Sequence, residues 1–181
     1  LIAARVQVDD TLADEAAALA DRHHLVREHR LVQINQLEAC LETGLTDRVT
    51  ELATGLSDHD WESQEDIENA RTTCLLAEAA LLQKDQERAR HLLGVAERSA
   101  RSTGQVFEMV RVAAIAARLE FERGAYEACF TRVKEAMGLA RKISDNLTDP
   151  SDRQLFQKLR MIQYLGARAR DLKARLSGSR K

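Results

Sequence analysis

Small and apolar residues recur along the chain at an interval of 40 positions, and this recurrence predicts its organisation. Gly44, Lys84 and Gly124 mark the same point of three successive segments. Apolar columns surround that point: Leu37, Ala77 and Ala117; Leu41, Leu81 and Phe121; Val49, Ala89 and Cys129; Ala53, Leu93 and Val133; Leu56, Ala96 and Ala136. A fixed period of this length is typical of stacked helical repeats.

Each segment predicts two helices joined by a tight turn. The first helices are expected over 25–43, 65–83 and 105–123, and the second helices over 46–57, 86–102 and 126–144. The middle second helix carries apolar residues three or four positions apart, as a one-sided helix does: Ala89, Leu92, Leu93, Ala96 and Ala100. Glycine in the turns suits the left-handed residue at a helix end.

Two flanking segments complete the predicted organisation. Residues 6–22 have the pattern of one more second helix, so 1–24 is interpreted as part of a preceding repeat, and 25–149 as three repeats. Asp149, Pro150 and Ser151 begin a last helix over 151–176, within a basic C-terminal segment, 150–181. Because the first residue is Leu1, we expect a piece of a longer protein.

Composition supports an all-α fold. Of 181 residues, 44% are hydrophobic but only 4% aromatic, with one proline and eight glycines. A β-sandwich or barrel needs more turns and more aromatic or β-branched strands, and no glycine-rich phosphate loop is present. The chain holds no apolar run of membrane-spanning length. The three cysteines are an odd number without paired spacing, which favours a reducing, cytoplasmic compartment.

Two stretches resemble the tetratricopeptide repeat. In 75–89, Leu76 and Ala77 match the family's leucine and small residue on the first helix, and Ala89 matches the small residue on the second. In 116–129, Gly124 and Tyr126 match the glycine and aromatic residue that close the turn, followed by the small Cys129. The period is 40 rather than the family's 34, and its tryptophan and proline are missing. The longer period looks like the repeats of large bacterial signal-responsive regulators.

The resemblance implies a right-handed α-solenoid of about three 40-residue helix-turn-helix repeats with flanking helices. It also implies a non-enzymatic interaction or sensory scaffold, without cofactor, in a larger bacterial regulatory protein. The expected partner is a protein or peptide on the concave wall of first helices. The residues expected there are Leu31, Asn35, Glu38, Arg71, Glu78, Arg111 and Arg118. The arginines among them could bind a carboxylate or an acidic peptide of the partner. Alternatively, they could pair within the chain with Glu38 and Glu78.

Charge is divided unevenly between the body and the C-terminal segment. Residues 1–150 carry 18 basic and 27 acidic residues, whereas 151–181 carry 9 basic and 2 acidic. A basic helix predicts an alternative function, contact with nucleic acid by a transcription regulator. The acidic body and the lack of stacking aromatics disfavour that function.

The last helix also predicts a contact surface. Leu155, Ile162, Ala169 and Leu176 recur every seven residues, with Leu165 and Leu172 between them. We expect Leu155, Leu159, Ile162, Leu165 and Leu172 to be buried. The first half is expected to dock on the third repeat, and the part from Gly166 on to be freer to bind another chain, as in a homodimer.

Other candidate residues favour structural roles. Asp21, His23 and His24 lack the converging geometry of a metal site, and Asp58, His59, Asp60 and Glu62 lack a calcium-loop spacing. Trp61 is expected to cover the end of a repeat. Buried positions at close helix contacts are predicted for Ala77, Ala89, Ala96, Ala117, Cys129 and Ala136, and a buried role for Cys40 and Cys74.

Overall fold

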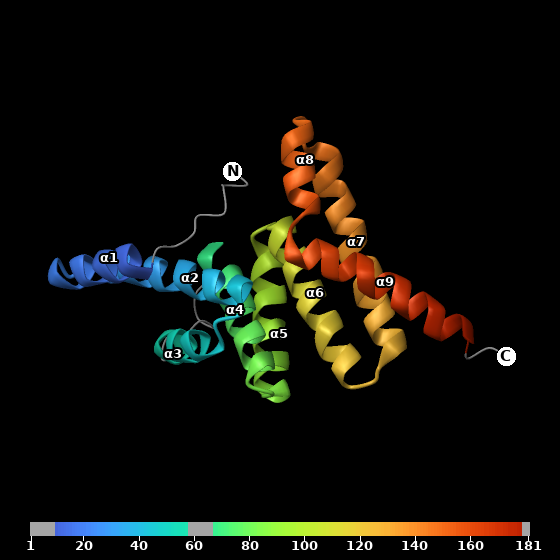
Figure 1. Cartoon of the computed structure of the whole chain (residues 1–181), viewed down its shortest axis with the longest axis horizontal. Coiled ribbons are helices and arrows are strands. Elements are labelled where there is room, and N and C mark those ends of the chain that lie inside the picture. Colours follow the sequence, from blue (N-terminus) through green and yellow to red (C-terminus); the bar gives the residue numbers. More distant parts are fainter. Residues whose placement is uncertain (1–9, 58–66, 179–181) are drawn as a thin grey trace.

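The computed structural model describes residues 10–57 and 67–178, and within them the chain is all-α without a strand. Its helices are α1 (Asp10–Arg22), α2 (Val26–Thr43), α3 (Thr46–Ser57), α4 (Ile67–Leu82), α5 (Gln86–Ser102), α6 (Val106–Glu122), α7 (Tyr126–Asn146), α8 (Pro150–Gln157) and α9 (Arg160–Gly178) (Figure 1). None of the helices in these two ranges is long and apolar enough to cross a membrane. The predicted all-α class is confirmed.

The three predicted turns lie where the 40-residue period places them. Gly44, Lys84 and Gly124 all have positive φ angles, of 79°, 62° and 74°. At the first turn the backbone N–H groups of Gly44 and Leu45 donate to the carbonyl of Cys40, at 2.8 and 3.0 Å. A left-handed residue thus ends each first helix and reverses the chain into the second, as glycine allows at little cost.

Small side chains lie at the closest contacts between helices. The pairs α4 with α5 and α6 with α7 have the most extensive contacts between helices in the described chain. All six positions predicted for such contacts are fully buried: Ala77, Ala89, Ala96, Ala117, Cys129 and Ala136. This prediction is confirmed. Small residues let two backbones approach, so a longer side chain there is expected to push the helices apart.

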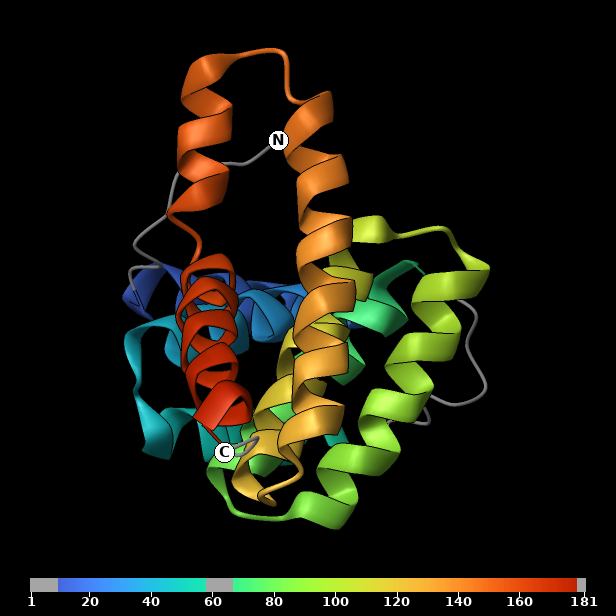
Figure 2. The ribbon, with the colours of Figure 1, turned by 90° about the vertical axis from the view of Figure 1, so that its right-hand side faces the viewer.

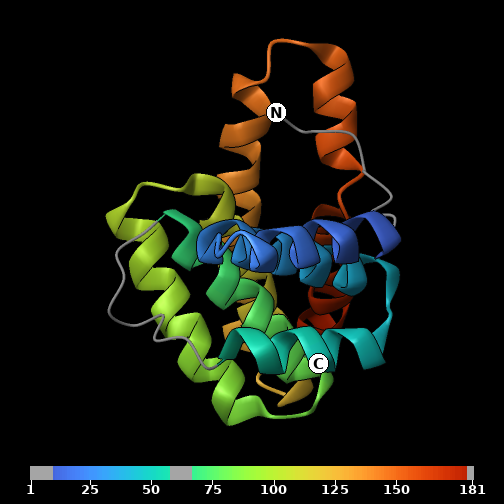
Figure 3. The same cartoon turned by 90° about the vertical axis from the view of Figure 1, so that its left-hand side faces the viewer.

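The first helices of the three segments lie next to each other. α4 contacts α2 on one side and α6 on the other. α5 packs against both α4, its hairpin partner, and α6. Figure 3 looks onto the end of the molecule formed by α1, α2 and α3. One side of α2, α4 and α6 therefore forms a shared surface, and the polar residues of that surface are described below.

The C-terminal segment differs from its prediction. The expected single helix over 151–176 is two helices, because α8 ends at Gln157 and α9 begins at Arg160. Phe156 and Leu165 are both fully buried, yet nine residues correspond to about two and a half helical turns. A straight helix would point these two side chains in opposite directions. The break lets α8 bury one and α9 the other.

The break also changes which leucines are buried. Leu155 is 46% exposed, so its predicted burial is wrong, since α8 packs through Phe156 instead. Leu165 and Leu172 are fully buried, whereas Leu159 and Ile162 are partly buried. Figure 2 shows α8 beside the far end of α7 and α9 along the rest of the hairpin. Because Leu172 packs against α6 and α7 residues, the half of α9 after Gly166 is docked as well, not free.

Candidate functional site

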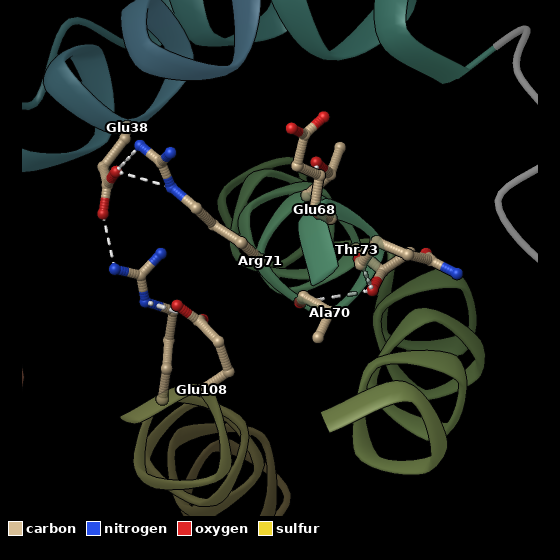
Figure 4. A network of polar contacts seen from close by, with 9 residues as sticks. Glu38, Glu68, Ala70, Arg71, Thr73 and Glu108 are labelled. Atoms are coloured by element: carbon tan, nitrogen blue, oxygen red, sulfur yellow. Dashed lines mark hydrogen bonds and ion pairs between the residues drawn. The ribbon is translucent and has the colours of Figure 1, made fainter. Parts of the chain in front are cut away.

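Glu38 of α2 links three neighbouring helices through two arginines. Its Oε2 accepts from Nε of Arg71 on α4 at 3.1 Å and also from Nη2 of Arg71, while its Oε1 accepts from Nη2 of Arg111 on α6. Asn35, one turn earlier on α2, accepts from Nη2 of Arg71 at 2.8 Å. Figure 4 shows the Glu38 carboxylate and the Arg71 guanidinium group pointing toward one another. We call Asn35, Glu38, Arg71, Glu108 and Arg111 the Glu38 cluster.

The charges within the Glu38 cluster favour an ionised Glu38. Burial by itself would raise the pKa of its carboxyl, but the positive charges of Arg111 and Arg71 outweigh burial and lower that pKa. Arg111 is the least exposed of these three side chains, at 13%. Burial would lower its pKa, but Glu108 and Glu38 raise it. The cluster is therefore a charged group held across three helices.

Glu108 completes the charge balance around Arg111. It lies one turn earlier on α6, with its Oε2 3.5 Å from Nε of Arg111. Burial raises the pKa of Glu108, and Arg111 opposes that rise only in part. Within the described structure, Oε2 of Glu108 and Nη1 of Arg111 are buried without a hydrogen bond. Burial also raises the pKa of the nearby Cys74 thiol, which keeps this residue in its unreactive, protonated form.

A second polar group lies further along the same helices. Nε of Arg118 donates to Glu122 at 3.0 Å, and its Nη1 lies 3.8 Å from Oε1 of Glu78 on α4. Burial raises the pKa of Glu78, while Arg160, Arg118 and Arg111 oppose the rise. Arg160, the first residue of α9, donates to the backbone carbonyl of Leu41 near the end of α2. The start of α9 thus reaches α2 across this surface.

The structure brings together most of the residues predicted for the wall. Asn35, Glu38, Arg71 and Arg111 form one connected group, and Glu78 and Arg118 form another; Leu31 is partly exposed on the preceding turn of α2. The arginines are partly buried rather than freely exposed, because each pairs with a glutamate of a neighbouring helix or turn. The alternative of internal pairing with Glu38 and Glu78 is thus the one observed.

Two contributors were missed from the sequence. Glu108 stands three residues before Arg111, a spacing that places the two on one helix face, and this signal could have identified it. Arg160 had no such signal, because its partner is a backbone carbonyl 119 residues away. Contacts of this kind depend on the path of the whole chain rather than on local spacing.

Two basic side chains of α9, Arg168 and Arg175, face the α6–α7 hairpin. The guanidinium carbon of Arg168 lies 3.6 Å from the ring centre of Phe121 and 5.1 Å from that of Tyr164. Asp171 lies 3.3 Å from Arg168 and 3.1 Å from Arg175. The cation–π contacts of Arg168 with Phe121 and of Arg175 with Tyr126 attach α9 to α6 and α7, whereas the pairs with Asp171 lie within α9. Together they remove two arginines from the predicted basic face.

The other candidates that lie within the described residues do not assemble a site. His23 and His24 are exposed, and Asp21 pairs with Nδ1 of His29 instead. The described residues contain no group of three histidine, cysteine or acidic side chains that could hold a metal ion. Cys40, Cys74 and Cys129 are buried, as predicted. Asp58, His59, Asp60, Trp61 and Glu62 lie outside the described residues.

No known protein family, curated protein or solved structure matches the chain.

Proposed function

We propose that the chain is a non-catalytic helical-repeat scaffold, of the right-handed α-solenoid type, that binds a protein segment on the surface of α2, α4 and α6. One observation carries the proposal: three helical hairpins turn at Gly44, Lys84 and Gly124, 40 residues apart, with their first helices side by side. Regular stacking of this kind creates a continuous surface rather than an enclosed reaction centre. The resemblance to the tetratricopeptide repeat supports the same function in a larger cytoplasmic regulatory protein.

The Glu38 cluster defines what that surface offers a partner. Its arginines are paired internally, so a partner need not neutralise them, and a free acidic peptide would have to displace Glu38 first. The groups left accessible are the exposed Asn35 and the partly exposed Leu31, one helical turn apart on α2. A partner with both an apolar side chain and a hydrogen-bonding group suits this pair better than a purely acidic one does.

The alternative, nucleic-acid contact through the basic C-terminal helix, has less support. Arg168 and Arg175 contact aromatic rings and Asp171, so they present little free charge to phosphates. A duplex-binding measurement at about 50 mM and about 200 mM salt separates the two functions, because phosphate contacts weaken steeply over that range.

A displayed peptide library selected on the immobilised chain tests the scaffold function. Selected peptides are expected to bind the parent and Thr50→Arg, an exposed control on α3, but not the Asn35→Arg variant, whose added side chain covers the surface. Circular dichroism checks that both variants fold. If no peptide is enriched, or if the peptides bind Asn35→Arg as well as they bind the parent, the proposal is wrong.

A further inference from the structure

An apolar stripe on α1 has no covering element in the described structure. Leu12 and Leu19 are 64% and 52% exposed, and Ala16 between them is exposed too. The opposite side of α1 packs on α2, where Ala20 is buried. We call Leu12, Ala16 and Leu19, together with the neighbouring Glu15, the α1 stripe. Two leucines seven residues apart lie about 10 Å from each other along one side of a helix.

The repeat period shows that such positions are buried when a neighbouring helix is present. Leu12 and Ala16 stand 40 residues before Leu52 and Leu56, which are buried in α3 between α2 and α4. α1 therefore presents to solvent the side that its counterpart α3 uses for packing. Exposed leucines in this arrangement favour contact with another helix.

The outer side of α9 has a stripe of matching spacing and opposite character. Gln163, Ala167, Arg170 and Ala174 are exposed, on the side of α9 away from the buried Leu165 and Leu172. Ala167, Arg170 and Ala174 are separated by three and four residues, as Leu12, Glu15 and Leu19 are. We call these four residues, Gln163, Ala167, Arg170 and Ala174, the α9 stripe.

Size and charge are complementary between the two stripes. The leucines of α1 would pack against alanines of α9, the combination of large and small side chains that allows helices to approach closely. Glu15 in the centre of one stripe corresponds to Arg170 in the centre of the other. The helices as wholes are also opposite in charge: α1 has four acidic residues and one basic, and α9 has five basic and one acidic.

We infer that the α1 stripe of one copy docks on the α9 stripe of a second copy. The two helices lie towards opposite ends of the long axis of the molecule (Figure 1). The contact therefore joins the head of one copy to the tail of the next. Each of the two copies keeps one of its two stripes available for a further copy. Such a contact adds further copies with rising concentration instead of closing as a symmetric dimer. It is independent of the proposed partner surface on α2, α4 and α6.

The size of the contact sets its expected strength. One pair of short helices buries less than the roughly 1,200 Å² of a standard interface, so association is weak and reversible. Opposite charges attract over about 10 Å at moderate salt and less as salt increases. Sedimentation velocity over a concentration series is expected to show growing average mass, reduced by added salt.

Charge-exchange variants test the pairing of Glu15 with Arg170. Glu15→Arg and Arg170→Glu are each expected to weaken association by about tenfold, and the double variant is expected to restore it. Lys142→Glu, an exposed change on α7, serves as the matched control and should leave association unchanged. Association that withstands Arg170→Glu would indicate a different contact and overturn the inference.

A mixing experiment tests the head-to-tail arrangement itself. Leu19→Glu blocks the α1 stripe and Ala167→Arg blocks the α9 stripe; each variant alone is expected to be monomeric. An equal mixture retains one intact stripe of each kind, so it is expected to form a one-to-one dimer and nothing larger. Monomers throughout, including for the parent at high concentration, would show that no second copy docks there. Urea unfolding checks that both variants are folded.

Discussion

The α6–α7 hairpin and the attachment of α9 to it are both buried helix contacts, but they use different side chains. Inside the hairpin the fully buried positions include Ala117, Cys129 and Ala136, all small. α9 is held by the large side chains of Leu165 and Leu172 and by Arg168 lying on Phe121. The first contact depends on the absence of side-chain volume, and the second depends on its presence.

This difference predicts opposite responses to mutation. A contact between small residues is damaged by adding atoms, because neighbouring backbones must move apart. A contact through leucines is damaged by removing atoms, because a cavity remains. The repeats can therefore keep one spacing through many segments, while α9 fits one place only.

The largest effect is expected at the attachment of α9. Leu165→Ala should lower the free energy of unfolding by about 2–5 kcal/mol, since it leaves a cavity at a fully buried position. Urea unfolding measures the change. Leu155→Ala is the matched control: Leu155 is 46% exposed, and its truncation should change stability by less than about 0.5 kcal/mol. Equal losses in both variants would contradict the break between α8 and α9.

The hairpin contact should respond to added volume. Ala89→Leu places three more carbons at a fully buried position of α5 and is expected to cost about 1–3 kcal/mol. Ala128→Leu, on the exposed side of α7, makes the same change where there is space. Denaturant midpoints compare them. An unchanged midpoint for Ala89→Leu would mean that the small-residue contact is not close-packed.

The Glu38 cluster is a third kind of contact between helices, and it is ionic rather than apolar. Glu38→Gln keeps the shape but removes the charge facing Arg71 and Arg111. With partial exposure taken into account, the loss should be about 1–2 kcal/mol. Glu51→Gln, which affects only the exposed pair with Arg48, is the control and should cost roughly 0–1 kcal/mol. If both cost the same, the cluster does not connect the helices.

The smallest effect is a change in how stability depends on pH. Folded Glu78 has a raised pKa, so it takes up a proton before the unfolded chain does, and stability rises as the pH falls towards the ordinary value of 4.5. Glu38 has a lowered pKa, so its stabilisation is present above 4.5 and is lost as the pH falls through its folded value. Urea unfolding at several pH values should show that Glu78→Gln flattens the rise and Glu38→Gln the fall.

An unchanged pH profile in Glu78→Gln would mean that Arg160, Arg118 and Arg111 compensate fully for the burial of Glu78. That result would contradict the raised pKa but leave the other three predictions standing.

The same comparison explains what could be predicted from the sequence. The hairpins were predictable because Gly44, Lys84 and Gly124 and the small residues around them recur at a fixed period. The shape of the C-terminal segment was not, because the break after Gln157 contains no glycine or proline and results from the opposed burial of Phe156 and Leu165.

The candidate site was predictable to a similar extent. Periodicity placed Glu38, Arg71 and Arg111 on a common side of neighbouring helices. It could not decide whether the arginines face a partner or the carboxylates of Glu38 and Glu78, since that depends on how each helix is rotated relative to the next. The contact of Arg160 with Leu41 lies beyond any pattern of local spacing.

That contact has a consequence for how the chain unfolds. In an open row of repeats each unit touches only its neighbours, so unfolding can begin at an end and spread inwards, unit by unit. Here Arg160 ties α9 to α2 over 119 residues, and Arg111 reaches Glu38 over 73. Fraying of one end therefore breaks contacts held by the other. The hairpins should therefore unfold together in one cooperative transition rather than in sequence.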